Sequence, residues 1–135
     1  ELVQPEYKRG IVYFVALQCV TSYFVAGIIK LINSDWRSGL ALRVFARQTL
    51  TKGEIPRWFA GAAQMPLQIF TWIVILFEIL FPLALISPGL ALILMLIAFS
   101  FHLGTVFLFG LNRFIWAWLT CYPAVFYTAV ALTQR

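Results

Sequence analysis

Four long runs of apolar residues, separated by short polar stretches, dominate the chain. They cover about residues 11–32, 66–87, 89–110 and 113–132. As helices with a rise of ~1.5 Å per residue, the runs span ~30–33 Å each, which is about the thickness of the hydrocarbon core of a bilayer. The pattern therefore predicts an all-α fold, a polytopic membrane bundle of about four transmembrane helices.

Short turns are predicted between the last three runs. The segment Ser87-Pro88-Gly89 contains a proline without a backbone N–H and a glycine that tolerates positive φ, so it predicts a tight hairpin. Asn112 and Arg113 mark a second short turn. Pro82 and Pro123 lie inside apolar runs, and each predicts a kink in its helix.

The long connection at residues 33–65 contains an amphipathic pattern. Between Leu40 and Leu50, apolar residues cover a broad arc of a helical wheel, while Arg43 and Arg47 share the remaining narrow face. This pattern is typical of an interfacial helix that lies along the membrane with its basic side chains at the headgroups. The segment is either a peripheral connector or a lid over a site.

Composition supports a membrane class. The chain is 62% hydrophobic and 11% charged, whereas about a quarter of the residues in a soluble domain are charged. The net charge of +5 lies at positions that flank the apolar runs, so we expect contact with membrane lipids and no binding of nucleic acid. We expect residues 1–135 to form a single transmembrane module that is a fragment of a larger membrane domain.

The basic residues also predict an orientation. One end of the predicted bundle holds Arg37, Arg43, Arg47, Lys52, Arg57 and Arg113. The other end holds Lys8, Arg9 and Arg135. Because cytoplasmic loops carry an excess of lysine and arginine, the 33–65 connection is predicted to be cytoplasmic.

Three ionisable residues, Lys30, Glu78 and His102, lie within apolar runs. Counted from the end of each run nearest the 33–65 connection, Lys30 is ~3–4 Å deep, His102 ~12 Å and Glu78 ~18 Å. If their helix faces converge, the three side chains line one polar cleft. The alternatives are that Lys30 only extends to the headgroups, that His102 only bonds a neighbouring helix and that Glu78 is a structural acid.

Metal chemistry has no sequence support. The single histidine, His102, is accompanied by two distant cysteines, Cys19 and Cys121. This spacing does not match a zinc site, so no metal is expected.

Several short motifs occur in a fixed order along the chain. They are Tyr23-Phe24, Ala26-Gly27, Lys30-Leu31, Asp35-Trp36, Gly39, Phe77-Glu78 with Pro82, Phe101-His102-Leu103-Gly104, Gly110-Leu111 and Phe114. Over roughly residues 11–127, this set resembles the HTTM (horizontally transferred transmembrane) domain, which includes the vitamin K-dependent gamma-carboxylases. Membrane modules of the DoxX type also carry a Gly-x-x-Lys-Leu-like helix and an acidic second helix, and they are the competing assignment.

The resemblance implies catalytic roles for the three ionisable residues. In the carboxylases, the lysine that matches Lys30 acts as the base that deprotonates a reduced naphthoquinone, so the implied cofactor is a lipid quinone or hydroquinone. His102 matches a histidine that orients groups or relays protons, and Glu78 matches an acidic position with a less defined role. A lysine in a medium of low dielectric loses its preference for the charged form, which suits a base.

Three function classes follow from these observations. The first is a quinone-linked enzyme with Lys30 as its base and His102 as its partner. The second is a non-catalytic accessory subunit that packs against other membrane subunits in a larger complex, with the same polar residues as contacts between helices. The third is a carrier of protons or small solutes that uses Glu78 and His102. The absence from this sequence of the family's upstream helices and of the soluble domain of the animal carboxylases favours the second class, whereas the retained Lys30, His102 and Glu78 favour the first.

Overall fold

The computed structural model describes residues 5–50 and 64–134, and this part of the chain is helical throughout, without strands. Its elements are α1 (Pro5–Ile32), α2 (Ser34–Arg37), α3 (Leu40–Leu50), α5 (Gln64–Leu80), the 3-10 helix η1 (Phe81–Leu85), α6 (Pro88–Phe109) and α7 (Asn112–Thr133). Four stretches are long and apolar enough to cross a membrane: α1, α5 with η1, α6 and α7. The predicted all-α, multi-pass fold is therefore confirmed, while Lys52, Arg57 and Arg135 of the charge argument lie outside the described residues.

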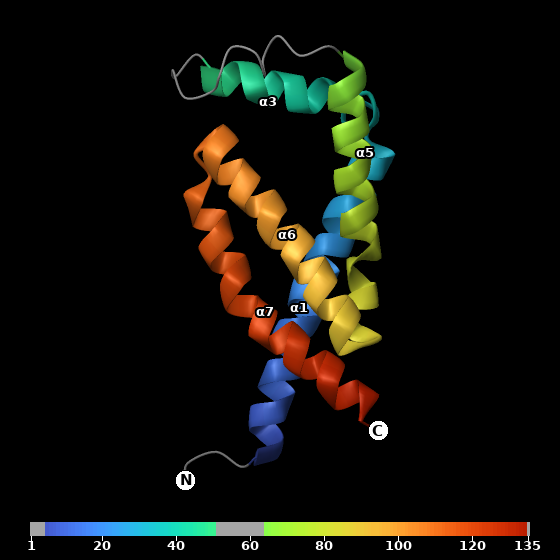
Figure 1. Cartoon of the computed structure of the whole chain (residues 1–135), viewed down its shortest axis with the longest axis vertical. Coiled ribbons are helices and arrows are strands. Elements are labelled where there is room, and N and C mark those ends of the chain that lie inside the picture. The colour runs from blue at the N-terminus through green and yellow to red at the C-terminus, as the bar shows by residue number, and fades with distance from the viewer. Residues whose placement is uncertain (1–4, 51–63, 135) are drawn as a thin grey trace.

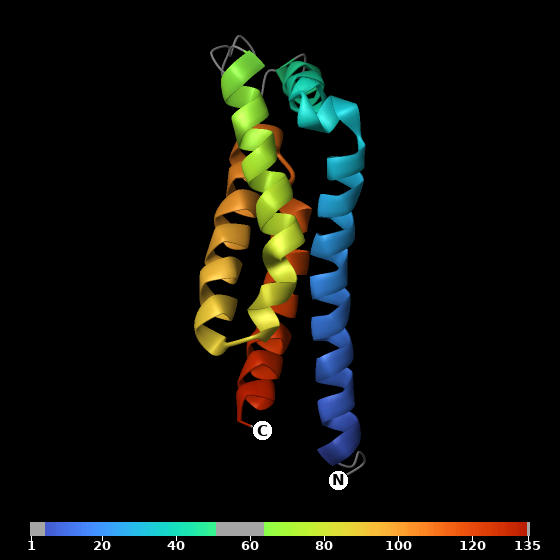
Figure 2. The same cartoon turned by 90° about the vertical axis from the view of Figure 1, so that its right-hand side faces the viewer.

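The four long helices form an elongated bundle, and α3 lies across one end of it (Figure 1). The beginning of α1 and the end of α7 both lie at the opposite end of the bundle (Figures 1 and 2). The predicted arrangement of the chain ends relative to the long connection is therefore confirmed. Figure 1 also shows that α5 and α6 are close together near η1 and diverge toward α3.

The first helix begins earlier than predicted, at Pro5 instead of residue 11. Proline is well tolerated in the first helical turn, and the carboxylate of Glu6 interacts favourably with the positive end of the helix dipole. Residues 6–10 are exposed. The helix therefore extends beyond the apolar run, because nothing in this polar segment ends it.

The second membrane span changes helix type near Pro82. The α-helix α5 ends at Leu80, and the chain continues as the 3-10 helix η1. Pro82 has no N–H with which to bond the carbonyl of Glu78, so an unbroken α-helix would lose a hydrogen bond at this point. Pro123, in contrast, lies inside α7, which continues past it.

The turn between η1 and α6 differs from the expected hairpin in one respect. The Ser87 side chain accepts a hydrogen bond from the backbone N–H of Leu90 at 3.2 Å, and Pro88 is the first residue of α6. Gly89 is helical and has no positive φ, so the turn does not use the conformational freedom of this glycine. Serine at the N-cap followed by proline strongly favours the start of a helix at Pro88, so Gly89 lies in the first turn of α6.

The two described glycines with positive φ end helical segments instead. Gly110 (φ 67°) ends α6 in the left-handed conformation, two residues before α7 begins. Gly39 (φ 77°) separates α2 from α3 and lies so close to α5 that an added Cβ would be 2.8 Å from the backbone nitrogen of Gln68. This contact fixes the end of α1 and α2 against the second turn of α5.

The amphipathic character of α3 is visible in its burial. Leu42 and Ala46 are buried against the bundle, whereas Arg47 is exposed and Phe45 is half exposed. The predicted placement of the arginines at lipid headgroups stays a prediction.

Candidate functional site

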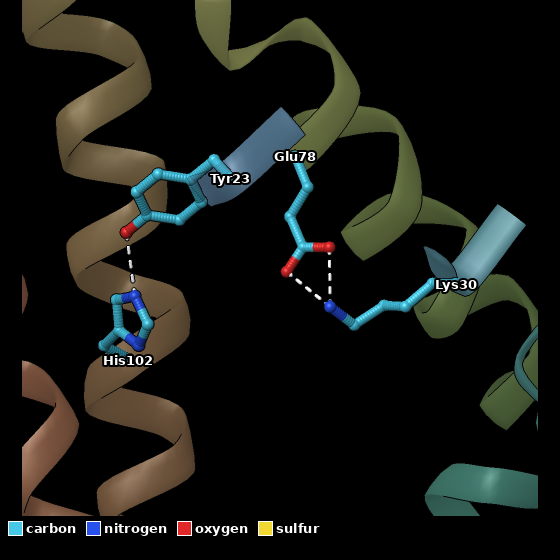
Figure 3. A network of polar contacts seen from close by, with 4 residues as sticks. All are labelled: Tyr23, Lys30, Glu78 and His102. Carbon is cyan, nitrogen blue, oxygen red and sulfur yellow. Dashed lines mark hydrogen bonds and ion pairs between the residues drawn. The ribbon is translucent and has the colours of Figure 1, made fainter. Parts of the chain in front are cut away.

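Lys30 and Glu78 form an ion pair between α1 and α5. The Lys30 Nζ donates to both carboxylate oxygens of Glu78, at 2.8 Å and 2.7 Å (Figure 3). The side chains are 15% and 5% exposed, respectively. Lys30 therefore turns into the bundle, and the alternative in which it only extends to the headgroups does not describe this structure.

A glycine lets the two helices approach at this pair. Gly27, one turn before Lys30, is buried, and an added Cβ would lie 2.9 Å from the backbone nitrogen of Ile79 and 3.0 Å from the Cβ of Glu78. Such distances are too short for any side chain. The absence of a side chain at Gly27 thus brings α1 close enough to α5 for Lys30 to reach Glu78.

The short helix α2 covers the pair from the α3 end. Asn33 caps α2 by accepting a hydrogen bond from the Asp35 N–H at 2.8 Å, and Arg37 donates to the carbonyl of Leu31 at 2.8 Å. These bonds fold α2 back over the last turn of α1. As a result, the Trp36 ring lies 5.3 Å from the Lys30 Nζ, within the range of a cation–π interaction.

His102 belongs to a second polar group, which joins three helices. The Tyr23 hydroxyl lies 2.8 Å from His102 Nε2 and 3.0 Å from the Tyr122 hydroxyl, so α1, α6 and α7 are linked at one level. All three residues are buried, and the His102 ring stacks on Trp118 with a centroid distance of 5.5 Å. This geometry matches the interpretation of His102 as a hydrogen-bonding contact between helices.

The three predicted residues therefore occupy two neighbouring groups instead of one shared cluster. Figure 3 shows Lys30 with Glu78 and, separately, His102 with Tyr23. Tyr23 and Lys30 are two helical turns apart, so both groups are anchored on one face of α1.

The depth order expected for these residues was wrong, because it assumed that the apolar runs end at one level. Gly27 packs against Glu78 and Ile79, so Glu78 lies level with a residue only ~7 Å from the end of α1, although it is far from the start of α5. The first turns of α5 extend past α1 toward α3 (Figure 1). This offset places Glu78 at the level that the Lys30 side chain reaches.

A cavity of about 460 Å³ lies between α5 and α6 beneath α3. Its walls are mostly aliphatic and aromatic side chains, including Trp36, Leu42, Phe45, Phe70, Phe77 and Phe101. The hydroxyl groups of Thr71, Ser100 and Thr105, which also line it, donate to carbonyls of their own helices. Lys30 is the charged residue in this lining.

No role was predicted from the sequence for Tyr23, Trp36 or Tyr122. Two signals were available: Tyr23 and Trp36 belong to the ordered motifs that resemble the HTTM domain, and the seven-residue spacing of Tyr23 and Lys30 places both on one helix face. Metal binding has no support from the described ranges, where no three His, Cys, Asp or Glu side chains form a group that could hold an ion.

Comparison with known proteins gives one result. The family model described as the HTTM domain matches residues 7–129. Searches of curated proteins and of solved structures each gave no match.

Proposed function

The chain belongs to the HTTM domain family and forms an integral, multi-pass membrane module, and from this premise we propose that it binds a lipid in the cavity beneath α3. The apolar part of the lipid occupies the cavity, and its polar head lies at Lys30. One observation carries this proposal: among the residues that the structure describes, the cavity of about 460 Å³ has apolar walls and a single ammonium group, that of Lys30, in its lining. Ligand sites commonly combine such walls with a few fixed polar groups.

The residues present fit a lipid quinone or hydroquinone. The aromatic rings of Phe45, Phe77 and Phe101 in the lining offer faces and edges to a planar ring or an isoprenoid tail. The Lys30 ammonium, which lines the cavity, donates hydrogen bonds, as a quinone oxygen requires, and the Glu78 carboxylate holds that ammonium in place from behind. When bound, such a group would supply redox chemistry.

The ion pair suggests how a proton would be held at this site. An ammonium group has three donors and no lone pair, whereas an ionised carboxylate only accepts. In the observed pair, the group able to take a proton is therefore the Glu78 carboxylate, with Lys30 as the donor beside it. We propose that the pair, and not Lys30 alone, acts as the base implied by the resemblance to the carboxylases.

His102 contributes to this site through the fold. Its bond to Tyr23 fixes α6, whose next turns line the cavity through Gly104 and Thr105. We propose that His102 is a positioning residue that keeps the α6 wall in place.

Filling the cavity tests the proposal directly. Gly104 lines the cavity on α6, and no atom lies within 4 Å of a Cβ added there. The Gly104→Leu variant should therefore fold normally but bind a lipid naphthoquinone about tenfold more weakly or worse, because its side chain takes the ligand's space. Native mass spectrometry of the protein released from nanodiscs that contain the naphthoquinone measures the bound fraction.

The same helix supplies the control for this experiment. Gly89 also has no atoms within 4 Å of an added Cβ, and it is absent from the cavity lining. Gly89→Leu should bind as the unchanged protein does. If Gly104→Leu binds the naphthoquinone as strongly as the unchanged protein does, the cavity is not the binding site.

We also propose that the α3 end of the bundle faces the cytoplasm. The support is the group of arginines at this end, which includes Arg37, Arg43, Arg47 and Arg113. An Arg47→Cys variant should react with a membrane-impermeant thiol reagent in inside-out vesicles and stay unlabelled in intact cells, since Arg47 is exposed. The reverse labelling pattern would contradict this orientation.

A further inference from the structure

The cavity beneath α3 is exposed along one flank. On α5, Phe70 and Ile73 line the cavity and are 42% and 56% exposed, whereas Val74, in the same lining, is buried. On α6, Ile97 and Ser100 line the cavity and are also exposed. A residue that both lines a cavity and is exposed lies at its mouth. The cavity therefore opens sideways between α5 and α6, and we call the mouth formed by Phe70, Ile73, Ile97 and Ser100 the lateral opening.

The lateral opening lies within the hydrocarbon region. Ser100 is twelve residues from the start of α6 at Pro88 and nine from its end at Phe109, or ~18 Å and ~14 Å along the helix. Ile73 precedes Ser87 by 14 residues and Ser100 follows it by 13, so α5 and α6 bring both to about the same level. Because the hydrocarbon core is ~30 Å thick, the opening faces lipid tails.

The chemistry of the lateral opening suits an apolar chain. Three of its four side chains are aliphatic or aromatic. The fourth, Ser100, donates its hydroxyl to the carbonyl of Leu96 at 2.8 Å, so this group needs no water at the opening.

Aromatic contacts narrow the cavity at its other two ends. Toward α3, the rings of Trp36 and Phe45 have a centroid distance of 6.0 Å, and Leu42 is buried beside them in the lining. Toward η1, the rings of Phe77 and Phe101 are 5.4 Å apart. Among the residues that the structure describes, the lateral opening is therefore the side on which the lining is exposed from both α5 and α6.

The flank opposite the lateral opening is the one that holds Lys30. Val74 is one helical turn before Glu78, whose carboxylate accepts both hydrogen bonds from the Lys30 ammonium. The buried face of α5 therefore points toward α1 and the ion pair, while Ile73 is on the membrane side. A ligand whose head contacts Lys30 has its tail directed toward the lateral opening.

We propose that the cavity takes its ligand from the membrane through the lateral opening and encloses only the head and the adjoining part of the tail. The rest of the tail stays in the bilayer. This inference rests on the proposed lipid site and adds to it the class of ligand, a long-tailed membrane lipid that is selected by its head and not by the length of its tail.

Blocking the lateral opening tests this inference. In the double variant Ile73→Trp/Ser100→Trp, two large side chains replace exposed ones on either side of the opening. Binding is compared for a naphthoquinone with a long isoprenoid tail and for the tailless methylnaphthoquinone, by native mass spectrometry from nanodiscs. The affinity for the long-tailed compound should fall about tenfold more than the affinity for the tailless one, because only the long tail has to pass the blocked opening.

Leu92→Trp is the matched control. Leu92 is exposed on α6, two turns from Ser100, and is absent from the cavity lining, so this variant should bind both compounds as the unchanged protein does. The inference is overturned if the double variant binds the long-tailed compound as strongly as the unchanged protein, or if it loses the two compounds to the same extent.

A measurement without any naphthoquinone separates this inference from the proposed function. The unchanged protein is reconstituted with a phospholipid that carries a photoreactive group at the end of an acyl chain. Labelling of Val74 or Phe77, which are buried in the cavity wall, would show that membrane chains enter through the opening, even if the protein bound no naphthoquinone. Labelling of Leu92 without either of these residues would overturn the inference and leave the lipid site itself standing.

Discussion

Replacing Lys30 with methionine is expected to destabilise the folded protein by about 3–5 kcal/mol. Methionine keeps the length and much of the apolar volume of the lysine side chain, but the Glu78 carboxylate, which is 5% exposed, loses both of its hydrogen bonds from Nζ. An uncompensated charge in a medium of low dielectric is among the most destabilising changes a protein can receive. Unfolding in sodium dodecyl sulfate, followed by circular dichroism, measures the loss.

The double variant Lys30→Met/Glu78→Leu should recover most of this stability. An apolar pair of similar volume is often as stable as the buried ion pair it replaces, because neither charge has to be desolvated. The double variant should nevertheless fail to bind the lipid naphthoquinone, since the ammonium group proposed to contact its head is gone. Additive losses in the two single variants and the double variant would show that Lys30 and Glu78 do not interact as described.

Gly27→Ala is expected to lower stability even though alanine normally favours a helix. At an exposed helix position, exchange of glycine for alanine stabilises by up to ~1 kcal/mol. At Gly27 the new Cβ would lie 2.8 Å from the Ile79 Cγ1 and 2.9 Å from the Ile79 backbone nitrogen. Overpacking of this kind costs about 1–3 kcal/mol, and the forced separation of α1 from α5 would also weaken the Lys30 to Glu78 contact.

Gly10→Ala is the matched control because Gly10 lies in the same helix, is exposed and has no atoms within 4 Å of an added Cβ. The two variants should shift the unfolding transition in opposite directions, with Gly10→Ala neutral or slightly stabilising. A stabilising effect from both would mean that α1 and α5 are farther apart at Gly27 than the structure shows.

The fold could be predicted from the sequence because a bilayer imposes a length on each apolar run. The apolar runs predicted to form the last two helices match α6 and α7 within one residue at each end. The turns before these helices lie at Pro88 and Gly110, as the residue types allow. The error at the start of α1 has a simple cause. Hydrophobicity marks where a helix enters the membrane, but backbone hydrogen bonding decides where it begins.

The residues of the candidate site could be predicted from the sequence, but which side chains contact each other could not. Burial of ionisable groups in apolar runs correctly drew attention to Lys30, Glu78 and His102. Their partners depend on how each helix is rotated about its axis and on how far α5 is shifted along α1. Residue spacing within one helix gives neither the rotation nor the shift. The cavity is a tertiary feature as well, because it arises where α5 and α6 diverge beneath α3 (Figure 1).

Photolabelling with a lipid naphthoquinone that carries a photoreactive group on its tail shows whether the ligand binds in the cavity beneath α3. After irradiation in vesicles, mass spectrometry of peptides locates the labelled residues. We expect labelling at the cavity wall, within residues 70–77 of α5 and 97–109 of α6, that is suppressed by unlabelled naphthoquinone and by Gly104→Leu. Labelling confined to outward-facing residues such as Leu92 and Leu96, or labelling that unlabelled naphthoquinone does not suppress, would contradict it.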